Sequence, residues 1–472
     1  MDTINEHDIA VIGMSGRFPD APDLKKYWEN LISGYNSIRQ SSKEELEASG
    51  IGVEIIQHPK FVNASSKLKD GSYFDAEFFG ISKREATIMD PQIRLLLETS
   101  WHALEDAGYA QGQLDDPVGN FCGMSFNTYL VDILQSKSIT ENFDPLLYRI
   151  LNDKDFLATW ISYKLNLTGP AMSIQTACST SLLAIHLACQ SLLNYECTLA
   201  LAGGVAFDAT RPVGYIHVAE SIYSKDGLCR PFDENASGTV GGDGVGVVVL
   251  KRASEAIEDK DYIYGIIKGT AANNDGSHKQ AYTAPSLNQQ RDVILEALSV
   301  SEIDPSTIGM VEAHGTGTKI GDPIEVAAIS EAYGEYTQDT NYCAIGSVKS
   351  NIGHLDAAAG IASFIKAILC VKNGKLVPSL HFTKPNPALN LESTPFYVSQ
   401  NQQQWPDRFD IRRAGISSLG VGGTNVHIIV EEPPQLKDRN TDKTWEARPY
   451  SDAVEILVPA KGADLYIFAG PS

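Results

Sequence analysis

The chain reads Ser173-Ile174-Gln175-Thr176-Ala177-Cys178-Ser179-Thr180-Ser181 and continues Leu182-Leu183-Ala184-Ile185-His186-Leu187-Ala188-Cys189-Gln190. Residues 181–193 are apolar on nearly every side, which predicts a helix that is buried all round. Cys178 would then lie at the N-terminus of this helix, where unpaired backbone N–H groups and the positive end of the dipole favour a thiolate. Its small neighbours leave room for a large group beside the sulfur. This segment alone leaves two interpretations open: a reactive nucleophile, or a cysteine that only packs in the core.

The composition is that of a globular protein with a substantial core. The 472 residues are 43% hydrophobic and 21% charged, enough for one large domain or a few ordinary ones. The net charge of −21 and the isoelectric point near 4.9 argue against binding to nucleic acid or an anionic membrane surface. No stretch approaches the roughly 20 apolar residues that span a bilayer, and the polar N-terminus is not a secretion signal. We therefore expect no nucleic-acid partner and no membrane.

The cysteines indicate a reducing compartment. They are odd in number, scattered and never in C-x-x-C spacing, which is typical of reduced thiols and not of a disulfide framework or a zinc site. We therefore expect a cytoplasmic protein without a bound metal. The seven positions are Cys122, Cys178, Cys189, Cys197, Cys229, Cys343 and Cys370.

Strand-like and helix-like segments alternate along the chain. Strand patterns cover residues 8–16, 118–124, 199–205, 241–250, 263–268 and 426–430, and helical patterns cover 23–32, 90–108, 156–165, 288–299 and 357–371. Residues 37–75 are polar and irregular and are expected to form surface loops. The glycine clusters at 13–16 and 241–246 do not have the spacing or order of a phosphate or dinucleotide loop.

Two segments, 181–193 and 357–371, are apolar nearly all round, one in each half of the chain. This indicates a duplicated α/β architecture with helices sandwiched between sheets. We expect a domain over residues 1–432, with an N-terminal half at about 1–260 and a C-terminal half at about 261–432. The composition changes at Pro433-Pro434, so residues 433–472 are expected to form a linker or tail.

Three motifs complete the pattern around Cys178. They are Thr176-Ala177-Cys178-Ser179-Thr180-Ser181, Glu312-Ala313-His314-Gly315-Thr316-Gly317-Thr318 and Lys349-Ser350-Asn351-Ile352-Gly353-His354. A cysteine with two distant histidines is a plausible set for covalent catalysis, since such residues need only converge in space. These motifs resemble the three signature motifs of β-ketoacyl synthases. Flanking segments such as Asp90-Pro91-Gln92 and Gly422-Gly423-Thr424-Asn425 resemble ketosynthase domains of modular polyketide synthases, and the likeness runs from about Ile9 to Glu432.

The resemblance implies the thiolase-like fold, in which two similar halves form a five-layer α-β-α-β-α sandwich, with a homodimer as the usual assembly. It implies carbon–carbon bond formation by decarboxylative Claisen condensation. Cys178 would accept an acyl chain, and a malonyl-type extender would lose CO₂ and attack the thioester. No bound cofactor is implied, because the phosphopantetheine of acyl or peptidyl carrier proteins carries the substrates. Neighbouring assembly-line domains would be further partners.

The resemblance also assigns roles to individual residues. His314 and His354 would hydrogen-bond the extender's thioester carbonyl and stabilise the enolate. The backbone N–H groups of Cys178 and Val421 would form the oxyanion hole. The remaining assignments are Lys349 and Glu325 as a structural ion pair, Thr316 and Thr318 as pantetheine-binding residues, and Leu419, Gly420 and Val421 as the gating loop.

Some positions depart from the family's pattern. Gln175 stands where many modular relatives have Asp, and Trp160 where Arg is frequent. Leu419 replaces a common Phe in the gating loop, and Val421 replaces another in many fatty-acid synthase relatives. A smaller gate would admit a bulkier or branched acyl chain, and an unchanged acyl preference in Leu419→Phe would contradict that hypothesis.

Three functions remain open at this stage. The favoured one is an elongating ketosynthase that extends a polyketide or hybrid chain. The second is a non-elongating relative that gatekeeps, transacylates or cyclises while using Cys178, and the third is a silent heterodimer partner. Silent partners typically lack the cysteine that this chain keeps. Because no docking helix precedes the first strand and no further domain follows, we interpret the chain as stand-alone or excised from a larger synthase.

Overall fold

The computed structural model describes residues 4–48, 51–109, 116–209, 213–219, 221–277 and 279–434. Its helices are α1 (Leu24–Ile32), α2 (Lys43–Ala48), α3 (Val53–Ile56), α4 (Lys83–Ile88), α5 (Pro91–Asp106), α6 (Tyr129–Gln135), α7 (Lys137–Thr140), α8 (Pro145–Ile150), α9 (Leu157–Leu165), α10 (Thr180–Leu193), α11 (Ala253–Glu258), α12 (Leu287–Ser301), α13 (Gly321–Gly334), α14 (Lys349–Ile352) and α15 (Ala359–Asn373). Its strands are β1 (Ile9–Arg17), β2 (Phe61–Val62), β3 (Val118–Met124), β4 (Ala171–Ser173), β5 (Leu199–Ala206), β6 (Tyr215–Ile216), β7 (Gly244–Arg252), β8 (Gly265–Asn274), β9 (Met310–Glu312), β10 (Cys343–Gly346), β11 (Lys375–Leu376), β12 (Phe396–Val398), β13 (Gln403–Gln404), β14 (Arg413–Leu419) and β15 (Thr424–Glu431).

These elements belong to a compact unit that runs from Met1 to Pro434. The tail predicted for residues 433–472 lies, from residue 435 onward, outside the described residues. In the described part of the chain, no helix is long and apolar enough to cross a membrane.

Both halves of the main sheet repeat one strand order. In the first half β3 lies parallel to β4 and β5, and β7 pairs antiparallel with β5 and β1. In the second half β9 lies parallel to β10 and β14, and β15 pairs antiparallel with β14 and β8. The antiparallel pair β1–β8 joins the halves. The order across the described sheet is β12-β10-β9-β14-β15-β8-β1-β7-β5-β3-β4.

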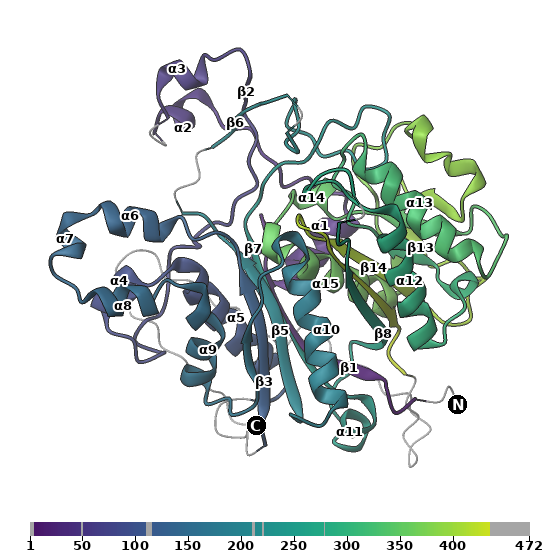
Figure 1. Cartoon of the computed structure of the whole chain (residues 1–472), viewed down its shortest axis with the longest axis horizontal. Helices are drawn as coiled ribbons and strands as arrows, with labels where there is room; N and C mark the ends of the chain where they lie inside the picture. The colour runs from purple at the N-terminus through teal and green to yellow at the C-terminus, as the bar shows by residue number, and fades with distance from the viewer. Residues whose placement is uncertain are drawn as a thin grey trace. The chain divides into compact units, whose positions relative to one another are not determined.

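Helices cover both faces of each half-sheet. Helices α10 and α15 pack on each other and on strands of both halves, and they run side by side in the centre of Figure 1. Helices α5 and α9 cover the outer face of the first half, and α12 and α13 lie outside the second. Three separate apolar clusters fill the interfaces between these layers. The predicted thiolase-like, five-layer duplicated architecture is therefore confirmed.

The two central helices approach closely at Gly360 of α15. A Cβ on this glycine would lie 2.8 Å from both the Cβ and the backbone nitrogen of Leu182 in α10. The Ser181 hydroxyl accepts a hydrogen bond from Ile361 N at 2.9 Å. Small residues at this crossing allow the two helix starts to meet, and the segments before these starts carry the candidate site.

Several predicted elements are confirmed, and the prediction for one region is wrong. The pattern at 90–108 forms α5, where the Asp90 side chain accepts from Gln92 N and Pro91 occupies the first turn. Residues 37–75, predicted as loops, contain α2, α3 and β2. Helix α2 begins at a capping box in which Ser42 and Glu45 exchange hydrogen bonds. That S-x-x-E spacing is visible in the sequence, but no apolar run follows it to mark a helix.

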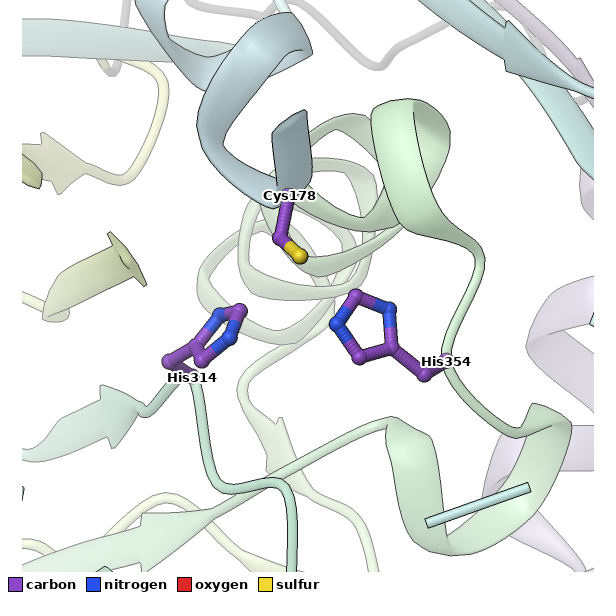
Figure 2. Close-up of side chains that lie close together, drawn as sticks. All are labelled: Cys178, His314 and His354. Carbon is purple, nitrogen blue, oxygen red and sulfur yellow. The ribbon is translucent and has the colours of Figure 1, made fainter. Parts of the chain in front are cut away.

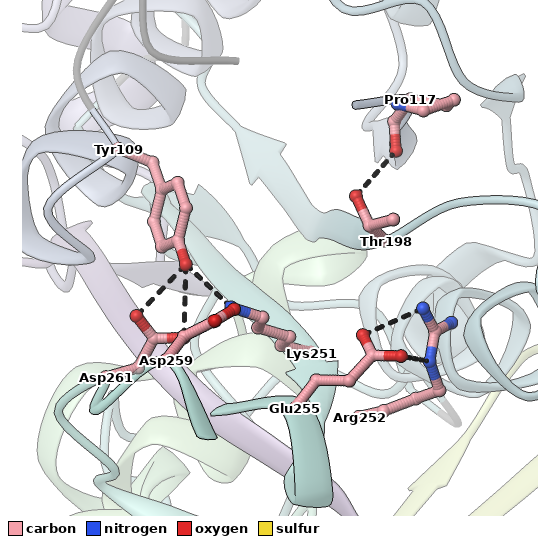
Figure 3. A network of polar contacts seen from close by, with 8 residues as sticks. All are labelled: Tyr109, Pro117, Thr198, Lys251, Arg252, Glu255, Asp259 and Asp261. Atoms are coloured by element: carbon pink, nitrogen blue, oxygen red, sulfur yellow. Dashed lines mark hydrogen bonds and ion pairs between the residues drawn. The ribbon is translucent and has the colours of Figure 1, made fainter. Parts of the chain in front are cut away.

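A polar network holds the end of β7 that lies away from Gly244. Figure 3 shows Lys251 bonded to Asp259, Asp261 and Tyr109, with the Lys251–Asp261 contact at 2.7 Å. The neighbouring Arg252 donates to the carbonyl of Leu192 at the C-terminus of α10, at 2.6 Å. A cation there satisfies a helix-end carbonyl and suits the negative end of the dipole. The network thus fixes α10 at the end opposite Cys178.

Candidate active site

Cys178 lies in the 3-10 turn Ala177–Ser179, which leads directly into α10. Ala177 has a φ of 53°, in the left-handed region, so the chain turns sharply one residue before the cysteine. The Ser418 hydroxyl donates to the carbonyl oxygen of Cys178 at 3.0 Å. The Ser179 hydroxyl donates to Thr176 O, also at 3.0 Å. These bonds hold the turn and leave Cys178 only 7% exposed.

Two histidines of the second half face the sulfur. His314 follows β9, and His354 follows α14. One ring nitrogen of each and Cys178 Sγ all lie within 4.8 Å of one another, and the two ring planes meet at 83°. Figure 2 shows the sulfur pointing toward the space between the rings. The structure therefore brings the three predicted catalytic side chains together.

His354 is held as a neutral hydrogen-bond donor. Its Nδ1 accepts the backbone N–H of Asp356 at 3.0 Å, so the ring proton of the neutral imidazole lies on Nε2. Burial, followed by the positive charge of Lys349, lowers the pKa of His354 to about 3. At neutral pH the side chain thus offers an uncharged N–H group to the site.

His314 is fixed through its backbone. Glu325 accepts the N–H of His314 at 2.6 Å and that of Gly315 at 2.9 Å. Burial, then the charge of Lys349 and the ring of His354, lowers the pKa of His314 well below its usual value. Its buried Nδ1 has no hydrogen-bond partner among the described residues. No described residue therefore fixes the tautomer of His314, and the unprotonated ring nitrogen of the neutral imidazole can accept a proton.

The expectation that the helix start favours a thiolate at Cys178 is wrong for the resting protein. Burial, followed by the negative charge of Asp356, raises the pKa of the Cys178 thiol to about 11. The Val421 N–H, the charge of Lys349 and the cysteine's own N–H act in the opposite direction but do not outweigh burial. Cys178 is therefore a thiol at neutral pH, and its deprotonation must accompany attack on a substrate.

The predicted oxyanion donors converge on the sulfur. The backbone N–H groups of Val421 and Cys178 both lie close enough to Cys178 Sγ to lower the pKa of the thiol. Val421 follows Leu419 and Gly420 in the turn between β14 and β15, and its own side chain is exposed. A Cβ on Gly420 would lie 2.3 Å from Thr176 O, so glycine is required for this close approach. The gating segment thus packs against the loop that carries Cys178.

The expected ion pair between Lys349 and Glu325 is not formed among the described residues. The reason is that both Glu325 oxygens accept the backbone N–H groups of His314 and Gly315. Lys349 is fully buried and affects the pKa of Glu325 only through its charge. A direct ion pair joins Lys366 to Glu312 instead, at 2.6 Å, with both side chains buried. Glu312 also accepts the Val348 N–H at 2.7 Å, which ties the two histidine motifs together.

Thr316 and Thr318 lie side by side after His314. Their hydroxyl oxygens are 3.2 Å apart, and both side chains are half-buried. Thr318 Oγ1 accepts the N–H of Gly321 at the start of α13. The pair is available for hydrogen bonding with a polar ligand arm.

A thiolate and two imidazoles also belong to the ligand types that zinc prefers. A closed zinc site needs a fourth ligand, and among the described residues no other His, Cys or acidic group joins Cys178, His314 and His354. The expectation of no bound metal remains a prediction. The geometry suits a buried thiol that receives a group from a substrate.

Sequence reasoning missed three contributors to this site. Asp356 orients His354, Ala177 provides the sharp turn, and the Glu312–Lys366 pair braces the histidine motifs. Asp356 lies two residues from His354, a spacing that allows a backbone N–H to reach the ring. Nothing in the sequence marks a positive φ at an alanine.

A duplicated five-layer α/β fold, with a cysteine at the start of one central helix and two neutral histidines facing it, defines a condensing enzyme that transfers acyl groups and forms carbon–carbon bonds. Family models agree with this class. The model of the β-ketoacyl synthase N-terminal domain matches residues 6–256, and that of the C-terminal domain matches 264–383. A model of the ketoacyl-synthetase C-terminal extension matches 385–464. The chain belongs to the β-ketoacyl synthase family and is a ketosynthase domain of the modular polyketide synthase kind.

Similar proteins support this assignment. A phenolphthiocerol/phthiocerol polyketide synthase of Mycobacterium tuberculosis H37Rv is 48% identical over 441 residues, or 92% of this chain and 30% of the relative. The polyketide synthase PksN of Bacillus subtilis 168 is 40% identical over 94% of this chain and 8% of its own length. The chain thus spans less than a third of these curated relatives.

Solved structures show the same fold. Ketosynthase twelve of the bacillaene polyketide synthase from Bacillus amyloliquefaciens has a TM-score of 0.87 at 40% identity, covering 91% of this chain and 76% of that one. The oxazolomycin ketosynthase domain from Streptomyces albus JA3453 has a TM-score of 0.81 at 34% identity, with the same coverage. Both are ketosynthases of polyketide synthesis.

Proposed function

We propose that this ketosynthase elongates acyl chains carried on the phosphopantetheine of acyl or peptidyl carrier proteins. The observation that carries the proposal is the convergence of Cys178 Sγ with His314 and His354 within 4.8 Å. Cys178 would hold the growing chain, and the extender would be a malonyl-type thioester on a second carrier. Thr316 and Thr318 would bind the pantetheine arm, which their adjacent half-buried hydroxyls support.

Loading is an exchange between thioesters. Sγ attacks the incoming carbonyl, the carbonyl–sulfur bond of the carrier thioester breaks, and the proton of Cys178 ends on the released thiol. Because Cys178 rests as a thiol, a neutral imidazole must accept this proton during attack. We assign that role to His314, since Nε2 of His354 already carries a proton. The N–H groups of Cys178 and Val421 would stabilise the oxyanion.

Condensation uses the same residues in a second step. The malonyl carboxylate leaves as CO₂, and its bonding electrons form an enolate on the extender. The enolate carbon attacks the acyl carbonyl, the Cys178–acyl bond breaks, and one proton from the site or solvent restores the thiol. His354 Nε2–H would donate to the enolate oxygen together with His314, and such preorganised donors each contribute about 3–4 kcal/mol to barrier lowering.

We also propose a homodimer in the cytoplasm. Strand β4 forms one edge of the described sheet, and Met172 on it is 46% exposed. An open strand edge favours pairing with another chain, so a second copy is the expected cover. All seven cysteines are free and buried, which supports a reducing compartment. The domain limits of 1–432, with halves meeting near 260, and further assembly-line domains as partners belong to the same proposal.

Intact mass spectrometry tests the function. The protein is mixed with an acyl-pantetheine thioester and then with malonyl carrier protein. We expect an acyl adduct on Cys178, followed by its disappearance and a 3-oxoacyl product on the carrier. An adduct that never extends would favour a gatekeeping, transacylating or cyclising role, and no adduct at all would exclude both.

A further inference from the structure

His354 lies on the short connection between α14 and the turn Asp356–Ala358 (Figure 2). The residue before it, Gly353, has a φ of 74°, and a Cβ there would lie 2.6 Å from Val240 O. Glycine suits this position, but it also restrains the backbone less than any other residue. The position of the His354 ring therefore depends on the contacts that other segments make with this connection.

Three consecutive peptide groups of the connection are each held by a hydrogen bond from the first half. The N–H of His354 donates to Val240 O at 2.7 Å, and its carbonyl oxygen accepts the N–H of Gly242 at 2.9 Å. The third peptide group is that of Ile352, whose carbonyl oxygen accepts the Ser66 hydroxyl at 2.5 Å. Backbone atoms supply the first two bonds, and a side chain supplies the third.

Ser66 is itself held in place. Its side chain is buried, its carbonyl oxygen accepts the N–H of Asp243 at 2.9 Å, and it forms an isolated β-bridge with Gly242. A Cβ on Gly242 would lie 3.2 Å from the Cβ of Ser66 and 2.9 Å from Ile352 O, so the three segments are in direct contact. The Ser66 hydroxyl therefore donates to Ile352 O from a fixed backbone.

The carbonyl of Ile352 takes this hydrogen bond from outside its helix. Ile352 is the last residue of α14, where carbonyl groups lack partners within the helix. Because Ile352 is buried, water cannot readily replace a lost bond, and an unsatisfied carbonyl there is unfavourable. Only Gly353 separates Ile352 from His354, so a shift of the Ile352 peptide group is passed on to the catalytic ring.

We propose that Ser66 is a positioning residue for condensation, because its bond to Ile352 O holds His354 where Nε2–H meets the enolate oxygen. This inference rests on the proposed decarboxylative extension and adds to it a first-half side chain that acts through His354. Loading of Cys178 does not use the His354 donor, so the Ser66 hydroxyl should affect extension and leave loading unchanged.

A double-mutant cycle with His354 tests the inference. Each variant is loaded with the N-acetylcysteamine thioester of hexanoic acid and mixed with saturating malonyl carrier protein, and intact mass gives the rate constant of extension per acylated protein. Ser66→Ala should lower this rate constant about fivefold, the effect of one neutral hydrogen bond, with loading within about twofold of wild type. In the His354→Ala background the same change should have an effect of less than about twofold, because the ring through which Ser66 acts is missing.

Ser301→Ala is the matched control, because this buried serine on α12 also donates its hydroxyl to a backbone carbonyl, that of Leu298. It should keep the wild-type rate constant of extension. An unchanged rate constant in Ser66→Ala, or an equal fall in both backgrounds, would overturn the inference while leaving extension by the wild type established.

Ser66→Gly removes the hydroxyl together with the Cβ and repeats the test. If neither Ser66 variant accepts an acyl group, the hydroxyl is needed for folding and the inference is wrong. A wild-type protein that loads hexanoyl but never extends it would remove the proposed function and the inference together.

Discussion

The two halves of the molecule share one backbone feature, a turn before the central helix, but carry different side chains on it. Each half leads into its central helix through a 3-10 turn, Ala177–Ser179 in the first and Asp356–Ala358 in the second. Each turn begins at a residue with positive φ, 53° at Ala177 and 45° at Asp356. The following helices α10 and α15 have 14 and 15 residues.

The residue after the positive φ is Cys178 in the first half and Ala357 in the second. The first half thus supplies the nucleophile, while the second supplies His314, His354 and Val421. The two equivalent turns pack on each other. The single site takes its residues from both halves, and each half contributes different groups. The comparison predicts that the acyl chain is held only on the first half, at Cys178, whereas His354 of the second half is needed for condensation and not for loading.

The largest effect is expected from Cys178→Ala. This change gives the first turn an alanine at the position that Ala357 occupies in the second turn. Acyl adducts should disappear completely, because no other cysteine among the described residues lies beside the two histidines. The proposed homodimer should persist in size-exclusion chromatography, since the fold keeps its packing. Cys197→Ala, another buried cysteine, is the control and should still load. Residual loading of the Cys178 variant would contradict the assignment of the nucleophile.

Changing His354 to Ala should separate the two chemical steps. Loading of Cys178 should persist, whereas the rate of extension should fall about 10²–10³-fold, as for loss of one oxyanion donor. His102→Ala serves as control because this histidine is exposed on α5 and bonds Glu105. Single-turnover mass spectrometry measures both rates. Equal losses of loading and extension would contradict the division of roles between the halves.

Breaking the Lys366–Glu312 pair should destabilise the protein. Lys366→Met leaves a buried carboxylate without its counter-charge, which typically costs about 3–5 kcal/mol of unfolding free energy. The double variant Lys366→Met/Glu312→Leu should recover part of this loss, because no charge remains buried. Urea denaturation followed by tryptophan fluorescence measures the change. An unaltered midpoint in Lys366→Met would show that the pair does not brace the second half.

The reactivity of Cys178 should depend steeply on pH. Since burial raises the pKa of this thiol to about 11, the thiolate is the minor form at neutral pH. The rate of Cys178 alkylation by iodoacetamide should therefore rise about tenfold per pH unit from 7 to 10. Tryptic mass spectrometry follows the site. A plateau already reached by pH 8 would contradict a resting thiol.

Much of the fold and of the site followed from the sequence, because strong local patterns mark them. The two segments that are apolar all round predicted the duplication, and the motifs around Cys178, His314 and His354 predicted the residues that converge. The resting state of Cys178 did not follow, since burial depends on tertiary packing that outweighs the local effect of a helix start. The predicted ion pair between Lys349 and Glu325 is also absent. Backbone N–H groups, which no sequence pattern reveals, donate to both carboxylate oxygens of Glu325.

The central claim is that the acyl chain loaded by the first half is extended by decarboxylative chemistry in the second. The most direct test supplies acyl-loaded protein with malonyl carrier protein that carries an isotope label in the free carboxylate, and measures labelled CO₂ and 3-oxoacyl carrier together. We predict equal amounts of both, with one turnover per loaded Cys178 and none in the Cys178→Ala protein. Release of CO₂ without extended product, or extension that retains the label, would contradict the account.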